Sequence, residues 1–322
     1  MSLKTECQID ISIVVSVFNE EEGIEIFYKE LNKVLISLNL CYEIIFINDG
    51  STDGTADILT KIVNQNKRIK LINFSRNFGH EAAMIAGLDH SSGKLTICMD
   101  ADLQNPPDAL PEMISTYEKG FDIILMKRIH REDAGFFSKF MSKCFYKIIN
   151  LISPVKFEAN SSDFFLINAK VRKVLVNSFR ERTRFLRGYI QIIGFRKTYL
   201  EYTAPSRIAG KSKYSVRKLF KLSVNAIASF SEKPLDLGIF AGLIMGIISM
   251  VVGIYSIVMY FIDKPVSGYT TIVVLISFLF SINFLIMGII GKYLAFLFSE
   301  TKGRPIYIVD EIMESSISNE TE

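Results

Sequence analysis

The sequence has 322 residues, a hydrophobic content of 49% and a mean hydropathy of +0.27, which is high for a soluble protein. Its 37 Lys and Arg against 34 Asp and Glu leave a net charge of only +3, too small to indicate binding to nucleic acid. The four cysteines are widely spaced and the three histidines are scattered, so neither disulfides nor a structural zinc site are expected.

Apolar strands and helices alternate over the first third of the chain. Each strand is a short apolar run that is followed by a polar loop and then by a helix. The strands are expected over residues 11–17, 42–47, 70–74 and 94–100, and the three helices between them end near residues 38, 64 and 88. Because these strands are apolar on both faces, the pattern predicts an α/β fold with a parallel sheet covered by helices on both sides.

Polar residues follow the four strands at the points where they end, namely Asn19, Asp49, Arg76 and Asp100. In open parallel sheets ligands bind beyond the carboxyl ends of the strands, so we expect these side chains to line one site. The first turn lacks Gly-x-Gly-x-x-Gly and begins an acidic run at Glu20, where a pyrophosphate would need backbone amides. A dinucleotide-binding Rossmann fold is therefore disfavoured, and a metal ion would have to carry the phosphate charge.

Asp100 and Asp102 form an Asp-x-Asp pair at the end of the fourth strand. Mg²⁺ and Mn²⁺ are commonly held by one or two carboxylates together with substrate phosphates, so the pair predicts a metal-diphosphate site. Taken alone, the pair also fits a solvated turn before Pro106 and Pro107.

Motifs distributed along nearly the whole chain carry a resemblance to a known family. They are Val15-Ser-Val-Phe-Asn-Glu-Glu-Glu, Asn48-Asp-Gly-Ser-Thr-Asp, Arg76-Asn-Phe-Gly, Met99-Asp-Ala-Asp-Leu-Gln-Asn-Pro-Pro, Ser162-Asp-Phe, Arg187-Gly and Arg207-Ile-Ala-Gly-Lys-Ser-Lys-Tyr. Together they resemble family 2 glycosyltransferases with a GT-A fold, and more narrowly the polyprenyl-phosphate glycosyltransferases, such as dolichol-phosphate mannose synthase and the bacterial bactoprenol glucosyltransferases. Two residues depart from the family pattern: Ser16 stands where the family usually has Pro, and His80 where it usually has Gln.

The resemblance implies roles for individual residues. Asp100 and Asp102 would hold the metal, Asp49 would bond the nucleotide base, and Arg76 would stack on or bond the nucleotide. Capping of the next helix is the structural alternative for Asp49, and a solvated loop cation is the alternative for Arg76. The predicted donor-binding set is Asn19, Glu20, Asp49, Arg76, Asp100, Lys211 and Lys213, and the predicted acceptor phosphate-binding set is Arg128, Arg131 and Arg207.

Asp163 matches the position of the family's catalytic acid, and with Asp102 it forms the predicted catalytic pair. A hydroxyl acceptor would need a general base here. A phosphate monoester, with a second pKa of about 6, is already largely anionic at neutral pH. We therefore infer that Asp163 orients the acceptor or the sugar at least as much as it removes a proton, with capping of a local turn as the structural alternative.

Two stretches with apolar residues at helical spacing and basic residues on the other face are expected over residues 136–152 and 215–235. In the first, Lys139, Lys143 and Lys147 follow each other at intervals of four. Such helices beside membrane spans indicate contact with anionic lipid, although ordinary surface helices of the catalytic domain would show the same pattern.

Residues 237–262 contain no charged residue and residues 269–298 contain only Lys292, and each run exceeds the roughly 20 residues that cross a bilayer. Two transmembrane helices are expected, joined by the short loop 263–268. Gly238, Gly242 and Gly246 form a small-residue seam that would favour either self-association or packing on the second helix. The N-terminus has no signal-peptide pattern, which places the catalytic domain and both termini in the cytoplasm.

The predicted organisation is a GT-A catalytic domain over residues 1–214, an interfacial helix over 215–235, a two-helix hairpin over 236–298 and a C-terminal tail over 299–322. An edge strand is expected over residues 305–309, and the acidic residues 315–322 are expected to be disordered. By resemblance the chain is a cytoplasmic-membrane enzyme that requires Mg²⁺ or Mn²⁺ and forms a homo-oligomer, a tetramer.

The predicted reaction is inverting transfer of one sugar from a nucleotide-sugar donor, UDP-glucose in the bacterial relatives, to undecaprenyl phosphate. GDP-mannose or another UDP-sugar is the alternative donor. A processive polysaccharide synthase is disfavoured because such enzymes carry a Gln-x-x-Arg-Trp motif and this chain has no Trp. A non-catalytic membrane component of a sugar-lipid pathway would explain the helix pair, but not the complete set of acidic and basic motifs.

Overall fold

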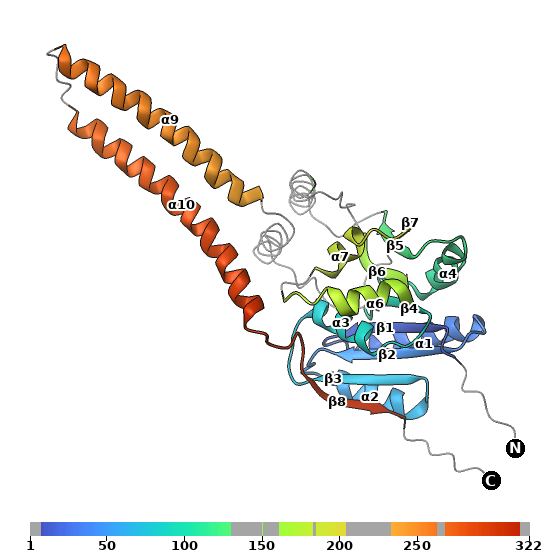
Figure 1. The fold of residues 1–322 in the computed structure, drawn as a ribbon. Helices are drawn as coiled ribbons and strands as arrows, with labels where there is room; N and C mark the ends of the chain where they lie inside the picture. The colour runs from blue at the N-terminus through green and yellow to red at the C-terminus, as the bar shows by residue number, and fades with distance from the viewer. Residues whose placement is uncertain are drawn as a thin grey trace, which may run out of the picture. The chain divides into compact units, whose positions relative to one another are not determined.

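The computed structural model describes residues 8–129, 150, 161–182, 185–203, 233–262 and 268–315. They fall into two compact units, one built around a sheet and one made of two long helices (Figure 1). Residues from Pro305 onward belong to the first unit. The two predicted amphipathic helices lie outside the described residues, apart from Asn150 and residues 233–235, as do Arg131, Arg207, Lys211 and Lys213.

Eight strands of the first unit form one sheet in the order β7-β5-β6-β4-β1-β2-β3-β8. The strands are β1 (Ile11–Val17), β2 (Tyr42–Asn48), β3 (Ile69–Phe74), β4 (Leu95–Asp100), β5 (Ile123–Arg128), β6 (Ser161–Asn168), β7 (Lys197–Tyr202) and β8 (Val309–Glu314). The helices of this unit are α1 (Ile24–Ser37), α2 (Thr55–Gln65), α3 (His80–His90), the short 3-10 helix η1 (Pro107–Ala109), α4 (Leu110–Glu118), α6 (Ala169–Ser178) and α7 (Leu186–Ile192). The four predicted strands and the α/β class are confirmed.

The strand order reverses beside β1, because β2 lies on one side of it and β4 on the other. All three strands are parallel, and Ser16 near the end of β1 pairs with Asp100 at the end of β4. Such a reversal opens a crevice at the carboxyl ends of the strands, since the following helices leave in opposite directions. Strands β6 and β8 are antiparallel to their neighbours, so the sheet is mostly but not wholly parallel.

Alternate residues of β2 are buried on opposite faces of the sheet. Ile44 and Phe46 belong to the apolar cluster that contains residues of α1 and α2, whereas Ile45 and Ile47 pack with the alanines of α3. Helix α3 approaches β1 so closely that a Cβ atom on Gly87 would lie 2.0 Å from the Cγ1 atom of Val14. The strand ends that carry the polar residues are therefore fixed by a core on each side.

The chain returns to the sheet after its last helix, where β8 forms the edge strand next to β3 (Figure 1). The edge strand was expected over residues 305–309, but it begins at Val309. Pro305 has no amide hydrogen to donate to a ladder, and the residues after it run to the sheet without joining it as a strand. The expectation of no disulfide is wrong for Cys41, which is disulfide-bonded. Which cysteines pair depends on the fold, and the spacing of cysteines in the sequence does not show it.

The second unit consists of α9 (Lys233–Phe261) and α10 (Tyr269–Thr301). Large apolar side chains along both are exposed, among them Phe240 at 65% and Phe284 at 68%. By length and composition, one helix of the described residues, Val274–Thr301, could cross a membrane, and Phe240–Tyr255 is a shorter apolar stretch. At Gly238 a Cβ atom would lie 3.2 Å from the Cγ2 atom of Ile286 in α10, whereas Gly242 and Gly246 have no such neighbour within 4 Å.

Candidate active site

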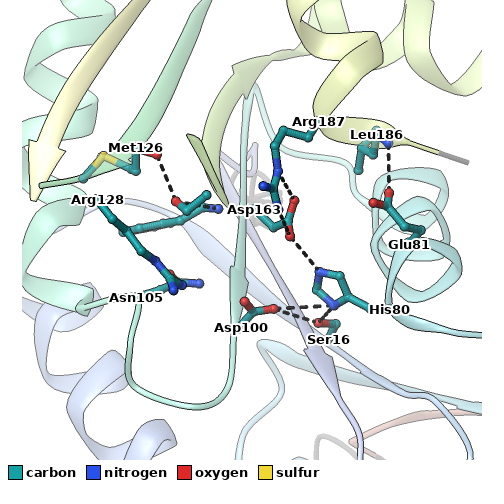
Figure 2. Close-up of polar contacts among 12 residues, drawn as sticks. Ser16, His80, Glu81, Asp100, Asn105, Met126, Arg128, Asp163, Leu186 and Arg187 are labelled. Carbon is teal, nitrogen blue, oxygen red and sulfur yellow. Dashed lines mark hydrogen bonds and ion pairs between the residues drawn. The ribbon is translucent and has the colours of Figure 1, made fainter. Parts of the chain in front are cut away.

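The carboxylate of Asp100 lies at the end of β4 and is reached from both β1 and α3 (Figure 2). The Ser16 hydroxyl donates to Asp100 Oδ1 at 3.3 Å, and His80 Nδ1 lies 2.9 Å from Ser16 Oγ and 3.5 Å from Asp100 Oδ1. Ser16 and His80, the two residues expected to depart from the family pattern, contact each other.

The chain turns sharply after Asp100. The Asp102 carboxylate accepts a hydrogen bond from the amide of Gln104 at 3.1 Å, and Leu103 between them has a φ of 57°. A leucine in this left-handed region costs about 1–2 kcal/mol, so the surrounding structure imposes the turn. The turn keeps Asp102 close to the end of β4, where Asp100 lies. A site formed by two carboxylates needs this proximity.

Asp163 comes from β6, which is antiparallel to β4. The pairing of Cys98 with Phe165 fixes a register that, continued by two residues, sets Asp163 across from Asp100. Arg187 of α7 binds the Asp163 carboxylate through two nitrogens, with Nε 3.0 Å from Oδ1 and Nη2 2.5 Å from Oδ2. His80 Nε2 lies 3.6 Å from Oδ2, so His80 bridges the carboxylates of Asp100 and Asp163 (Figure 2).

The charges of this cluster reinforce one another. Burial by itself would lower the pKa of His80, but Asp100 and Asp163 outweigh it and raise the pKa of His80 to about 10, so the imidazole is a cation. Burial would likewise raise the pKa of Asp163, but Arg187 and His80 outweigh it and hold the pKa of this carboxyl far below its usual range. Asp163 is therefore a stable anion and a very weak base.

Glu81 holds the helix that carries Arg187. Its carboxylate accepts a hydrogen bond from the amide of Leu186, the first residue of α7, at 2.9 Å. Burial and the neighbouring Asp163 raise the pKa of Glu81. The contact fixes the start of α7 next to the start of α3, where His80 lies.

Asn19 and Glu20 connect the loop after β1 to the loop after β2. The Asn19 side chain accepts from the amide of Thr52 at 2.8 Å, and the amide of Glu20 donates to the hydroxyl of Thr55 at 2.9 Å. Asn19 has a φ of 54°. The two residues predicted to touch the donor thus also fix the loop that carries Asp49.

Asp49 is 3% exposed, and its carboxylate accepts hydrogen bonds from the amides of Phe78 at 2.7 Å and Gly79 at 2.9 Å. Asp49 therefore caps the loop that precedes α3. The structural alternative given above was a cap on the helix that follows Asp49, which is α2. Gly50 beside it has a φ of 66°, and a Cβ atom there would lie 2.5 Å from the carbonyl carbon of Arg76. Only glycine fits this close approach, and the Arg76 guanidinium lies over the Phe78 ring at 4.0 Å.

Arg128, predicted to bind acceptor phosphate, is linked to the loop that follows Asp102. Its Nε donates to the hydroxyl of Tyr202 at 2.8 Å and its Nη1 to Gln104 Oε1 at 3.2 Å. The Tyr202 hydroxyl donates in turn to Asn105 Oδ1 at 3.1 Å. Asn105 is fully buried, and Figure 2 shows its side chain beside Arg128.

A divalent cation suits the donor set that Asp100 and Asp102 provide. Both supply hard carboxylate oxygens, and among the described residues no group of three or more His, Cys, Asp and Glu is arranged to hold a metal by itself. Asp100 and Asp102 would hold the ion through these oxygens, and hard divalent cations commonly combine one or two carboxylates with substrate phosphates. The residues present therefore fit the predicted ion.

The structure brings the predicted residues Asn19, Glu20, Asp49, Arg76, Asp100, Asp102, Arg128 and Asp163 to the carboxyl ends of β1–β4 and the neighbouring ends of β5 and β6. The sequence pattern assigns no role to Arg187, Glu81 or Tyr202. Arg187 lies within a motif of the family and His80 departs from the family pattern, so the sequence carries a signal for both. It carries none for the hydroxyl of Tyr202, which lies on an edge strand.

Comparison with known proteins supports the family that the sequence motifs indicate. Residues 12–175 match the profile described as Glycosyl transferase family 2. The chain belongs to this family. This family 2 glycosyltransferase is 37% identical to an "Uncharacterized glycosyltransferase YkcC" of Bacillus subtilis, over 94% of both chains. It is also 37% identical to a "Prophage bactoprenol glucosyl transferase homolog" of Escherichia coli, over 94% of this chain and 99% of that one.

The "Bactoprenol glucosyl transferase" of Shigella phage SfII is a third relative of this family 2 chain, 37% identical over 93% of the chain and 97% of the relative. Among solved structures, mannosyl-3-phosphoglycerate synthase from Rubrobacter xylanophilus resembles it with a TM-score of 0.50 and 15% identity, over 68% of this chain and 72% of that one. At this identity the likeness concerns the fold, which is the GT-A type of mostly parallel sheet.

Proposed function

We propose that the chain transfers one glucose from UDP-glucose to a membrane polyprenyl phosphate, undecaprenyl phosphate in bacteria, with inversion at the anomeric carbon. The names of the bactoprenol glucosyl transferase relatives support both the sugar and the lipid class. In this reaction an oxygen of the acceptor phosphate attacks the anomeric carbon, and the bond from that carbon to the nucleoside diphosphate breaks. GDP-mannose or another UDP-sugar is the alternative donor.

The observation that carries the proposal is the state of Asp163. Arg187 holds this carboxylate through two nitrogens and His80 flanks it, so it is unsuited to remove a proton from a hydroxyl group. A phosphate monoester needs no such base, since it is largely dianionic above pH of about 6. Asp163 instead orients Arg187 and His80 and places negative charge where the anomeric carbon becomes electron-poor.

The donor occupies the crevice at the ends of β1, β2 and β4 in this proposal. Asp100 and Asp102 would hold Mg²⁺ or Mn²⁺, and the ion would supply Lewis-acid stabilisation of the departing diphosphate. Asp49 fixes the loop that carries Arg76, and the exposed Arg76 guanidinium, which lies over the Phe78 ring, is proposed to bind the nucleotide. Lys211 and Lys213 are proposed to bind the donor diphosphate, and Arg128, Arg131 and Arg207 the acceptor phosphate.

The acceptor's lipid tail requires the enzyme to lie at a membrane. We propose that α9 and α10 both cross the bilayer as a hairpin and that the catalytic unit and both termini are cytoplasmic. The exposed apolar side chains along both helices support this arrangement. Membrane lipids are then partners of the chain, and the predicted homo-oligomer, a tetramer, remains part of the proposal.

A donor panel tests the function. Purified chain with Mn²⁺ and undecaprenyl phosphate is given UDP-glucose, UDP-galactose, UDP-N-acetylglucosamine or GDP-mannose, and the lipid product is identified by its mass. Product with UDP-glucose is expected, and the matched control is the Asp102→Asn variant in the same assay. Product with another donor would correct the sugar, whereas no lipid product with any donor would favour a non-catalytic membrane component.

A further inference from the structure

The segment that joins α10 to β8 lies against a loop of the candidate active site. We define residues 305–309 as the return segment and residues 75–79, between β3 and α3, as the donor loop. The amide of Ser75 donates to the carbonyl oxygen of Ile308 at 3.1 Å, which extends the β3–β8 pairing into the donor loop. The two segments are more than 200 residues apart in the sequence.

Aromatic side chains connect the return segment to the donor loop. Tyr307 stacks on Phe74, with ring centroids 5.1 Å apart and planes at 13°. The rings of Phe74 and Phe78 form a T-shaped pair with centroids 5.7 Å apart. Phe78, Ile306 and Val309 belong to the same apolar cluster. Phe78 is therefore held from the side of the return segment, while Asp49 holds its amide from the end of β2.

Tyr307 also fixes the far end of α3. Its hydroxyl donates to Asp89 Oδ2 at 2.7 Å, and Arg180 binds the same carboxylate at 2.7 and 3.0 Å. Burial and the contact with Asp89 raise the pKa of Tyr307, so the hydroxyl stays protonated and donates. Since α3 begins with His80 directly after the donor loop, the return segment contacts both the loop and the helix that follow β3.

We propose that the return segment positions the donor loop and α3, so that the chain beyond α10 forms part of the nucleotide-sugar site. The inference rests on the proposed function, because the roles of Arg76 and His80 are assigned there. Tyr307 is a positioning residue in this proposal because it acts through Phe74, Phe78 and Asp89. Only residues 302–304 separate the end of α10 from the return segment in the chain.

Two variants of Tyr307 and one control test the inference in the full-length chain. Tyr307→Ala removes the ring and the hydrogen bond, and Tyr307→Phe removes only the bond to Asp89. The matched control is Ile312→Ala, because Ile312 lies in β8 beyond the return segment and its side chain is 45% exposed. Binding of UDP-glucose with Mn²⁺, the KM for undecaprenyl phosphate and hydrogen exchange of the amides of residues 75–79 are measured.

We expect Tyr307→Ala to raise the Kd for UDP-glucose about tenfold and Tyr307→Phe about threefold, with the control unchanged. The KM for the lipid acceptor should stay the same, and the donor-loop amides should exchange faster in both Tyr307 variants. An unchanged Kd together with unchanged exchange in Tyr307→Phe would overturn the inference, even if Tyr307→Ala failed to fold. If the wild-type chain bound no nucleotide sugar, the proposed function would fail, and the exchange data would still decide whether the return segment holds the loop.

Discussion

Asp102 is the residue on which the proposed metal dependence rests. Replacing it by Asn keeps the size of the side chain and one oxygen, but removes the charge that offsets a bound cation. We expect Asp102→Asn to lower kcat/KM by about 1,000-fold, equivalent to about 4 kcal/mol, with unchanged thermal unfolding. The measurement is transfer to undecaprenyl phosphate over a range of Mn²⁺ concentrations. Wild-type-like rates for this variant in the presence of a chelator would contradict the metal assignment.

Asp163 makes a separate prediction about pH. Because Arg187 and His80 hold the pKa of Asp163 far below its usual range, Asp163 stays ionised at every pH at which the chain is assayed. The rate should then fall below pH of about 6, where the acceptor phosphate becomes protonated, and not near the ordinary pKa of an aspartate of about 4. The measurement is kcat/KM for the acceptor between pH 5 and 8.

The matched variant for this test is Asp163→Asn. We expect it to lose turnover far more than affinity for the donor, while its residual activity keeps the same acid limb. If the fall in rate at low pH disappears in Asp163→Asn, Asp163 would be identified as a general base. A donor affinity that falls as steeply as the rate would place Asp163 in the donor site instead.

At the scale of elements, the loop after β4 is held by a strand at the far edge of the sheet. The Tyr202 hydroxyl of β7 accepts from Arg128 and donates to Asn105, which follows the predicted metal-binding pair in the chain. Tyr202→Phe keeps the ring, which packs edge-on against Phe164, and removes both hydrogen bonds. A lost bond to a buried partner costs about 1–3 kcal/mol, so we expect a lower unfolding temperature and a rate reduced about tenfold.

Tyr42→Phe is the control for this prediction. Tyr42 is also a buried tyrosine whose hydroxyl donates to an asparagine, Asn32, at 3.0 Å, but it lies at the opposite end of the sheet from the site. We expect it to lower the unfolding temperature without changing kcat/KM. Equal losses of activity in both variants would mean that Tyr202 serves the stability of the sheet alone.

The elements differ in how far the sequence could predict them. Strands β1–β4 are continuous apolar runs, and the polar residues that end them converge because parallel strands end at one edge, so both follow from local pattern. The contact between Arg187 and Asp163 depends on how α7 packs beside β6. The spacing of apolar residues in the sequence does not predict this packing. The pairing of β8 with β3 joins segments separated by both long helices, and only the folded chain brings them together.

At the scale of the whole molecule, the position of β8 constrains how the chain meets a membrane. Because β8 belongs to the same sheet as β1–β7, we expect both ends of the proposed helix hairpin to lie on the same side of a bilayer. In this proposal α9 and α10 cross together or not at all. With 29 residues α9 spans about 43 Å, more than the hydrocarbon core of about 30 Å.

Reporter fusions decide this topology. Alkaline phosphatase fused after Ile262, at the end of the described part of α9, should be active because it lies outside the cytoplasm. Green fluorescent protein fused at either terminus should fluoresce, since both termini remain inside, and the N-terminal fusion serves as the control for expression. An inactive phosphatase with fluorescent termini would mean that both helices lie on the membrane surface without crossing. A dark C-terminal fusion beside a fluorescent N-terminal one would mean a single crossing. That result would contradict the proposed hairpin, because β3 and β8 pair in one sheet and cannot lie on opposite sides of a bilayer.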